Sequence, residues 1–297
     1  MTVLDEPILL ADPAETAASP RGMWRTALGL WRTRVGLGLL AGLVALAVIG
    51  PWLAPYGETE FVGTPNLRDV EGATLGTDYF GQDVLSRFLY GGRSILVLAV
   101  LSTALALVSG VTIGLVAAYS RGLVDNVLMR LMDINLAFPQ LLLALVALTT
   151  IGPKAWVIVL VVGFTTMPRI ARVTRGAAVP VVERDFVSAA QALGESRFRI
   201  LRSEILPNVS GPLLVEANLR LTYSIAIIAA LGFLGFATSV NAANWGLMIQ
   251  ENKGAVSVQP WGMILPGLAI ALLTVGTGLV GDGLARAAAG IDRKKAT

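Results

Sequence analysis

The amino-acid sequence predicts an all-α membrane protein that crosses the bilayer with six helices. Hydrophobic residues make up 55% of its 297 positions and charged residues only 14%, and the mean hydropathy is +0.70. Soluble domains carry about 25% charged residues. The apolar residues are grouped into runs, several of which approach the ~20 residues that a bilayer-spanning helix needs. A polytopic membrane protein therefore explains this composition better than two soluble domains do.

Residues 1–34 are expected to form a cytoplasmic tail. After a mixed, partly acidic start, four apolar residues stand at helical spacing between arginines: Trp24, Leu28, Trp31 and Val35. This spacing indicates either an interfacial helix lying on the membrane or the basic flank of the first span. The first span is expected at Val35–Leu53. A signal peptide is disfavoured, because the apolar run starts late and is bounded by prolines rather than by a cleavage site.

Five more spans follow, at Ile95–Tyr119, Leu136–Ile151, Trp156–Met167, Pro212–Phe236 and Pro260–Val280. The fourth is short, so we expect it to tilt or to extend past Pro168. Residues 136–167 could instead be one span broken at Gly152 and Pro153, but the charged turn there favours two. The predicted transmembrane domain covers residues 35–285 and includes a polar outer segment at 56–93.

Positive charge sets the expected orientation, because cytoplasmic loops of membrane proteins are enriched in Lys and Arg. With six spans, one side carries 17 such residues and the other five, when Arg220 inside a span is left out. The richer side includes the tail, the loop 169–211 and the C-terminal segment 286–297. A five-span arrangement would place either the seven-Arg loop or the four-charge end outside. Both termini are therefore expected in the cytoplasm.

The cytoplasmic loop has a pattern of its own at residues 185–208. Its first half has an apolar, mostly small face at helical spacing, formed by Phe186, Ala189, Ala190 and Leu193. We expect Pro180 to open this helix and Gly194 to end it in a left-handed cap. Such a helix outside the membrane either docks into a groove of another protein or packs on the ends of its own spans.

A second short helix is expected after the turn. Ser196 can cap its start and Pro207 is expected to stop it. Its apolar stripe consists of Phe198, Leu201 and Ile205.

The residue types that are missing restrict the chemistry. The chain has no cysteine and no histidine, which excludes disulfides, Cys/His metal sites and Ser-His-Asp catalysis. No lysine follows a glycine, so the GxxxxGK[ST] phosphate loop is missing and any ATP must be bound by another polypeptide. A permease with separate ATPases, an ion-coupled carrier, a channel and a membrane scaffold all remain open. The arginines lie beside spans, which indicates topology rather than nucleic-acid binding.

Three further residue pairs stand out. Glu216 and Arg220, one turn apart in the fifth span, indicate either a local ion pair or a gate at its cytoplasmic side. A GxxxG at Gly110 and Gly114 permits close helix contact. Asp78 and Asp83 have little weight as a catalytic or metal-binding pair.

The loop 185–208 resembles the EAA loop of binding-protein-dependent ABC importer permeases, through its Ala-Ala pair, Gly194 and the closing Leu-Pro-Asn. Ser188 stands where that family commonly has Glu, and Glu204 where it often has His. Four other segments resemble the dipeptide/oligopeptide/nickel permeases, at 75–96, 124–145, 230–249 and 260–285. The likeness covers nearly everything after about residue 30, and it favours the second permease of the pair.

This resemblance implies the type I ABC importer permease fold and an outer, helical segment before span two. It implies a complex in the bacterial inner membrane with a homologous second permease, two ATPase subunits that hold ATP and Mg, and an extracytoplasmic solute-binding protein. The implied cargo is short peptides, with nickel complexes, haem or other small solutes as variants. This chain would itself hold no cofactor and catalyse no reaction. The residues implied to couple to the ATPase are Asp185, Phe186, Ser188, Ala189, Ala190, Leu193, Gly194, Leu206, Pro207 and Asn208.

Overall fold

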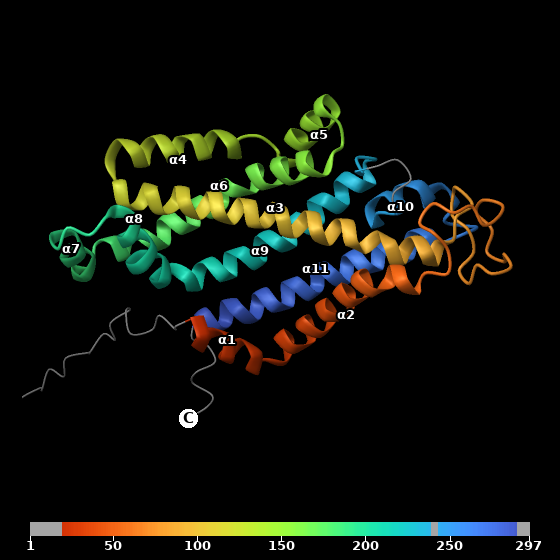
Figure 1. The fold of residues 1–297 in the computed structure, drawn as a ribbon, viewed down its shortest axis with the longest axis horizontal. Coiled ribbons are helices and arrows are strands. Elements are labelled where there is room, and N and C mark those ends of the chain that lie inside the picture. The colour runs from red at the N-terminus through yellow and green to blue at the C-terminus, as the bar shows by residue number, and fades with distance from the viewer. Residues whose placement is uncertain (1–19, 239–242, 290–297) are drawn as a thin grey trace, which may run out of the picture.

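A computed structural model describes residues 20–238 and 243–289, and in these ranges the regular structure is helical, with isolated bridges instead of strands. Figure 1 shows the long helices running side by side, with the short helices α7 (Asp185–Ala192) and α8 (Arg197–Arg199) at one end. The opposite end carries α10 (Trp245–Asn252), the 3₁₀ turn Lys253–Ala255 and the irregular segment 54–83. We call these the α7 end and the α10 end.

The described residues contain five helices long and apolar enough to cross a membrane. They are α2 (Trp31–Leu53), α3 (Val84–Ser120), α6 (Ala155–Val182), the continuous helix Arg197–Phe233 that ends as α9 (Leu206–Phe233), and α11 (Trp261–Ala288). A sixth span arises when α4 (Gly122–Leu136) and α5 (Gln140–Ile151) are counted together, although they meet at a 78° bend. The structure thus matches the six predicted spans when this bent pair is counted as one span.

A proline explains the bend. Pro139 lacks the N–H that helix continuation needs and disfavours the helical conformation at Phe138, so α4 ends before this pair and α5 begins after it. The expected third span corresponds to α5 alone. The turn expected at Gly152 is present, with a φ of 100° between α5 and α6.

Other boundaries differ because prolines are tolerated within these helices. The fourth span extends past Pro168, as expected. Pro180 also lies inside α6, so the expectation that it opens a new helix was wrong. In membrane helices, neighbouring groups and local adjustments can satisfy the backbone carbonyl that a proline leaves free. The last span is longer than expected, because α11 continues to Ala288.

Helices α3 and α6 share the most extensive contact of any two helices in the described ranges, and the GxxxG motif lies between them. A Cβ added at Gly110 would lie 2.8 Å from the Met167 carbonyl oxygen, and one added at Gly114 would lie 2.5 Å from the Ala171 carbonyl oxygen. Close helix contact is thus the role of this pair. Helix α4 is fastened to the same α6 by ion pairs, including Arg175 Nε to Asp125 at 2.5 Å.

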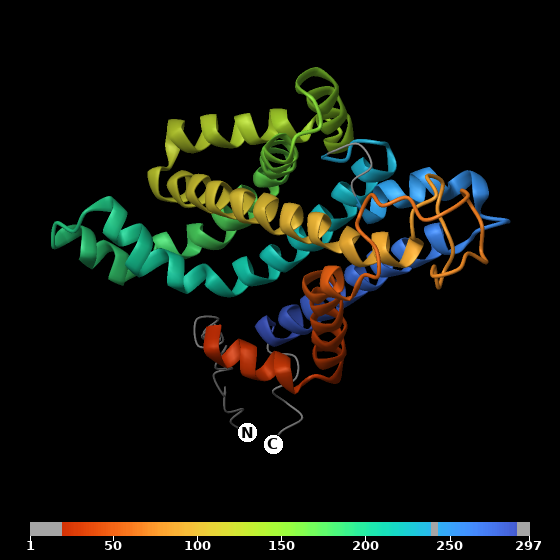
Figure 2. The same cartoon turned by 45° about the vertical axis from the view of Figure 1, so that its right-hand side comes forward.

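The N-terminal part of the described chain forms a separate helix, α1 (Pro20–Gly29), and the four apolar residues of the expected stripe are divided between α1 and α2. Figure 2 shows α1 turned away from the direction of α2 and placed beside the end of α11. Ala27 is fully buried in that contact, and Arg32 pairs with Asp282 of α11 at 3.1 Å. The acidic start of the tail and the last residues of the C-terminal segment lie outside the described residues.

The segment 54–83 is irregular, which contradicts the helical outer segment that the resemblance implied. Three isolated bridges and three glycines with positive φ, Gly72, Gly76 and Gly81, fold it into a series of turns. Asp83 is the last residue of this segment and caps α3. It accepts hydrogen bonds from the Ser86 amide at 2.8 Å and from the Ser86 hydroxyl at 2.6 Å. The segment can fold without a helix because its polar groups are bound by α3 and by the α10 region.

Candidate functional site

Helix α7 is seated on the ends of the long helices by two side chains. Val187 is fully buried and Ala190 nearly so, within a cluster that includes Leu115, Val182 and Ile200. The Gln191 amide adds a hydrogen bond of 3.2 Å to the Tyr119 hydroxyl at the end of α3. The short helix is thus held against α3, α6 and the start of the Arg197–Phe233 helix.

The turn after α7 has the geometry that its sequence predicts. Gly194 has a φ of 76°, and its amide donates to the Gln191 carbonyl at 3.0 Å while the Glu195 amide donates to the Ala190 carbonyl at 3.1 Å. These two bonds form a Schellman motif, which needs a left-handed residue at its centre. Ser196 then accepts a hydrogen bond of 3.4 Å from the Arg199 amide and caps the next helix, as expected.

The expectation that Pro207 stops the second helix was wrong. Residues Ile200–Ile205 form a π-helical segment, and Pro207 lies in the first turn of α9, where a missing N–H is tolerated. The change from π to α geometry thus lies just ahead of the proline. The Asn208 amide donates to the Glu204 carbonyl at 2.6 Å and braces this junction. The closing Leu-Pro-Asn therefore joins the loop to the fifth span without a break.

The expected apolar face of α7 is divided by the fold. Ala190 points inward, whereas Ala189 is exposed and Phe186 and Leu193 are 36% and 83% exposed. Phe198, expected to share a stripe with Leu201 and Ile205, is 70% exposed, while Ile205 is fully buried. Four apolar residues of the loop are thus exposed, and we call them the coupling face after the role proposed for them below: Phe186, Ala189, Leu193 and Phe198. Asp185 and Ser188 are exposed beside it.

Glu216 and Arg220 are brought together within α9. Their side chains are 8% and 11% exposed, and Arg220 Nε lies 2.7 Å from Glu216 Oε1. The guanidinium also lies 5.0 Å from the centre of the Tyr223 ring. The arrangement matches the local ion pair, the simpler of the two interpretations of this pair.

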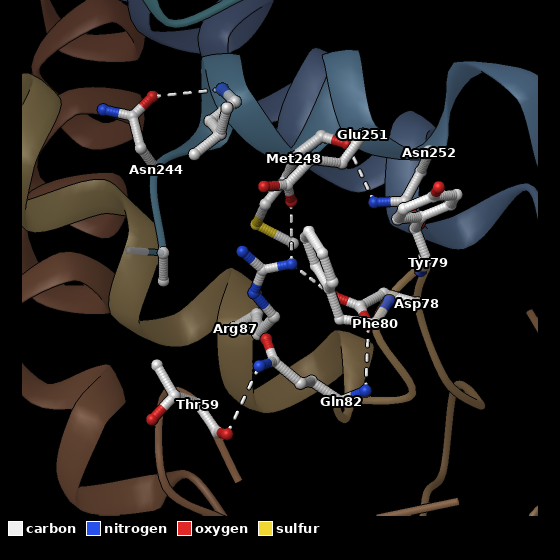
Figure 3. Close-up of polar contacts among 12 residues, drawn as sticks. Thr59, Asp78, Tyr79, Phe80, Gln82, Arg87, Asn244, Met248, Glu251 and Asn252 are labelled. Carbon is white, nitrogen blue, oxygen red and sulfur yellow. Dashed lines mark hydrogen bonds and ion pairs between the residues drawn. The ribbon is translucent and has the colours of Figure 1, made fainter. Parts of the chain in front are cut away.

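A cluster that the sequence did not indicate lies at the α10 end. Arg87 of α3 is fully buried and contacts two carboxylates, Asp78 of the irregular segment and Glu251 of α10, the latter at 2.8 Å (Figure 3). We call these three residues the buried ion cluster. Burial raises the pKa of Glu251, and the charge of Arg87 opposes that shift. Asp78 and Asp83 thus have separate structural roles and do not form a pair of acids.

Hydrogen bonds surround this cluster and fasten the irregular segment to the helices. Asn252 accepts from the Tyr79 amide at 3.0 Å, and the Gln259 amide donates to the Leu75 carbonyl at 2.7 Å. The Trp245 indole, fully buried, donates to the Phe88 carbonyl at 2.8 Å. In the part of the chain that the structure describes, no group of three or more acidic residues is placed to bind a metal ion.

Both the fold and the sequence of the chain are similar to those of known transport proteins. An inward-facing structure of the MetNI methionine ABC transporter superposes with a TM-score of 0.55 at 18% identity, covering 68% of this chain and 96% of that one. The di/tripeptide transport system permease protein DppC of Pseudomonas aeruginosa is 34% identical over 92% of this chain and 93% of its own length. The peptide transport system permease protein SapC of Escherichia coli is 35% identical over 83% and 86%.

The described residues hold five apolar helices long enough to cross a membrane, or six spans with the bent pair, in a fold shared with a chain of an ABC transporter. Residues 110–289 match the family described as binding-protein-dependent transport system inner membrane component. The chain belongs to this family, and it is an inner-membrane permease component of a transport system. Membership sets aside the ion-coupled carrier, the channel and the scaffold that composition alone had left open.

Proposed function

We propose that this chain is one of two homologous permease subunits of an ATP-driven importer of short peptides. The observation that supports this most is its similarity, over nearly its whole length, to a relative named for di/tripeptide transport. In this proposal an external solute-binding protein delivers the peptide, and this chain supplies half of the path through the membrane. Two separate ATPase subunits bind ATP and Mg.

The α7 end is proposed to face the cytoplasm and the α10 end the outside. Four of the seven arginines between residues 169 and 202 lie in the short helices and caps at the α7 end, which positive charge favours placing inside: Arg184, Arg197, Arg199 and Arg202. Helix α1 and the end of α11 lie beside each other (Figure 2), and the proposal places both of them, with the two termini, on the cytoplasmic side.

The coupling face is the proposed contact with an ATPase. Its apolar side chains are exposed although α7 is firmly seated by Val187 and Ala190, so the helix presents a preformed surface to a groove. Asp185 and Ser188 lie beside the contact, while Gly194, Leu206, Pro207 and Asn208 shape the loop that holds it. Closing of the ATPases would push on α7 and rock the spans between inward-open and outward-open packings.

The Glu216–Arg220 pair is proposed to act during the same movement. It lies within the membrane part of the helix that continues from the loop, where an unpaired charge is costly. Movement of this helix that exposed either side chain to a water-filled path would ease separation of the pair, which is the property of a gate.

The test is peptide uptake by the assembled transporter carrying Leu193→Gln. Leu123, at the start of α4, is also 83% exposed and serves as the matched control, as Leu123→Gln. We expect Leu193→Gln to lower the affinity for the ATPase subunits by about tenfold, since it removes an apolar anchor from an interface, and to reduce uptake accordingly. Leu123→Gln should change neither.

Two results would count against the proposal. Equal losses in both variants would show that the α7 surface has no special role in ATPase binding. A wild-type assembly that imports no di- or tripeptide, while it hydrolyses ATP, would remove the peptide assignment and leave only the family.

A further inference from the structure

A cavity of about 730 Å³ lies at the α10 end, beside the buried ion cluster. Its size is within the ~300–1,000 Å³ typical of small-molecule sites. The α5–α6 turn, the chain that follows α9, and α10 form its walls, and the irregular segment contributes two aromatic rings. The lining residues with polar or aromatic side chains that matter here are Tyr79, Phe80, Lys154, Glu251 and Lys253.

Negative charge in this cavity comes from one buried residue. Glu251 lines the cavity although its side chain is only 8% exposed, and it contacts Arg87 behind it (Figure 3). The same guanidinium also binds Asp78, so two carboxylates share one positive charge. Burial raises the pKa of Glu251, as expected for a carboxylate whose charge is not fully compensated. A ligand cation at this wall would supply the missing positive charge.

Positive charge comes from two lysines on other elements. Lys154 follows the α5–α6 turn, and Lys253 follows α10, with its Nζ 5.8 Å from the centre of the Phe233 ring. Both are exposed, and no carboxylate within ion-pair distance of either is found among the described residues. The cavity thus presents an acid and two ammonium groups on separate walls.

Two aromatic rings complete the lining. Tyr79 and Phe80 lie edge to face, with ring centres 5.2 Å apart. Phe80 also lies 5.9 Å from the Arg87 guanidinium, which ties the aromatic wall to the buried ion cluster. Aromatic faces can hold apolar side chains of many shapes without selecting one. Such a wall suits a ligand with constant ends and a variable middle.

We propose that this cavity is an entry site for peptides, in which Glu251 receives the terminal ammonium group and Lys154 with Lys253 receive the terminal carboxylate. The inference rests on the proposed function and adds to it a selection for free peptide termini by the permease itself. The variable side chains would lie against Tyr79 and Phe80.

The experiment uses the complete transporter with its solute-binding protein in proteoliposomes. Initial uptake rates are measured for a free dipeptide, its C-terminal amide and its N-acetyl form. Each ratio of rates is then compared between variants, so that the selectivity of the unchanged binding protein cancels. The variants are Glu251→Gln and the double change Lys154→Met with Lys253→Met. Arg68→Met, which removes an exposed positive charge of the irregular segment outside the cavity lining, is the control.

We expect the double lysine variant to lower the preference for the free dipeptide over its amide about threefold, the size of exposed ion pairs. It should leave the preference over the N-acetyl form unchanged. Glu251→Gln should lower the preference for the free dipeptide over its N-acetyl form by about tenfold, because it removes a buried charge-assisted hydrogen bond. It should leave the preference over the amide unchanged. Arg68→Met should alter neither ratio.

The two lysines are exposed, so their variant keeps the test decisive even if Glu251→Gln fails to fold. Unchanged amide ratios in a transporter that imports dipeptides would overturn the entry site and leave the proposed function intact. A wild-type assembly that imports no dipeptide would overturn both.

Discussion

The two ends of the molecule are held together by opposite means. At the α10 end, a fully buried arginine, two carboxylates and a set of side-chain hydrogen bonds fasten an irregular segment to α3, to α10 and to the turn before α11. At the α7 end, the short helix is seated mainly by apolar contacts of Val187 and Ala190, and its one charged residue, Asp185, is exposed. Directional polar contacts define one geometry, whereas apolar contacts allow a small helix to shift as a body.

The largest loss of stability is expected when Arg87 is replaced by Met. Two carboxylates would then be buried without a counter-charge, at a cost of about 3–5 kcal/mol. Thermal unfolding of the purified protein in detergent measures the loss. Adding Asp78→Asn and Glu251→Gln to the same chain should recover much of it. A single variant as stable as the wild type would mean that the buried ion cluster does not hold this end.

A smaller loss is expected from Val187→Ala at the other end. It removes two methyl groups from a fully buried site, which corresponds to about 1–3 kcal/mol. The loss should be local, so hydrogen exchange should rise in α7 while the α10 end stays protected. Val108→Ala, at a site 70% exposed in α3, is the control and should change neither.

Substitutions at Gly194 test whether the backbone conformation of the turn matters for coupling, apart from the packing of α7. Gly194→Val should cost about 1–2 kcal/mol, because a β-branched residue resists the positive φ. Gly194→Asn should cost less, since Asn accepts that conformation. We expect Gly194→Val, but not Gly194→Asn, to raise the number of ATP molecules hydrolysed per peptide imported. Equal ratios for the two variants would show that the turn conformation is irrelevant to coupling.

The smallest loss of stability is expected from Arg199→Met. It replaces an arginine by methionine, as Arg87→Met does, but at the α7 end. Arg199 is 69% exposed and pairs with Glu195 at 3.5 Å. Such pairs contribute at most about 0.5 kcal/mol. A loss comparable to that of Arg87→Met would erase the contrast between the two ends.

Local patterns predicted much of the α7 loop. Gly194 and Ser196 have the backbone roles that their residue types favour, because caps depend on a few neighbouring residues. Pro180 and Pro207 were misinterpreted as helix boundaries, since in this fold each is accommodated inside a helical run. Which face of α7 is buried could not be predicted, because α3, α6 and the fifth span decide it.

The buried ion cluster at the α10 end could not be predicted from the sequence, for a different reason. Arg87 and Glu251 are 164 positions apart, and nothing in either neighbourhood indicates the other. The one local signal was an arginine among apolar residues at the start of a long helix, which requires a partner when buried. The apolar runs did predict the long membrane-crossing helices, because each run depends only on residues that are close together in the sequence.

The helix from Arg197 to Phe233 is uninterrupted, so the start of this helix in the loop and the fifth span would move as one unit. Its 37 residues, at ~1.5 Å each, extend about 55 Å, well beyond the ~30 Å of the hydrocarbon layer. A tilt of about 5° would displace one tip by about 5 Å relative to the other. The far tip leads directly into Gly235, Ala237 and Thr238, which form a wall of the entry cavity. A push on the coupling face would therefore change the width of the cavity at the opposite end.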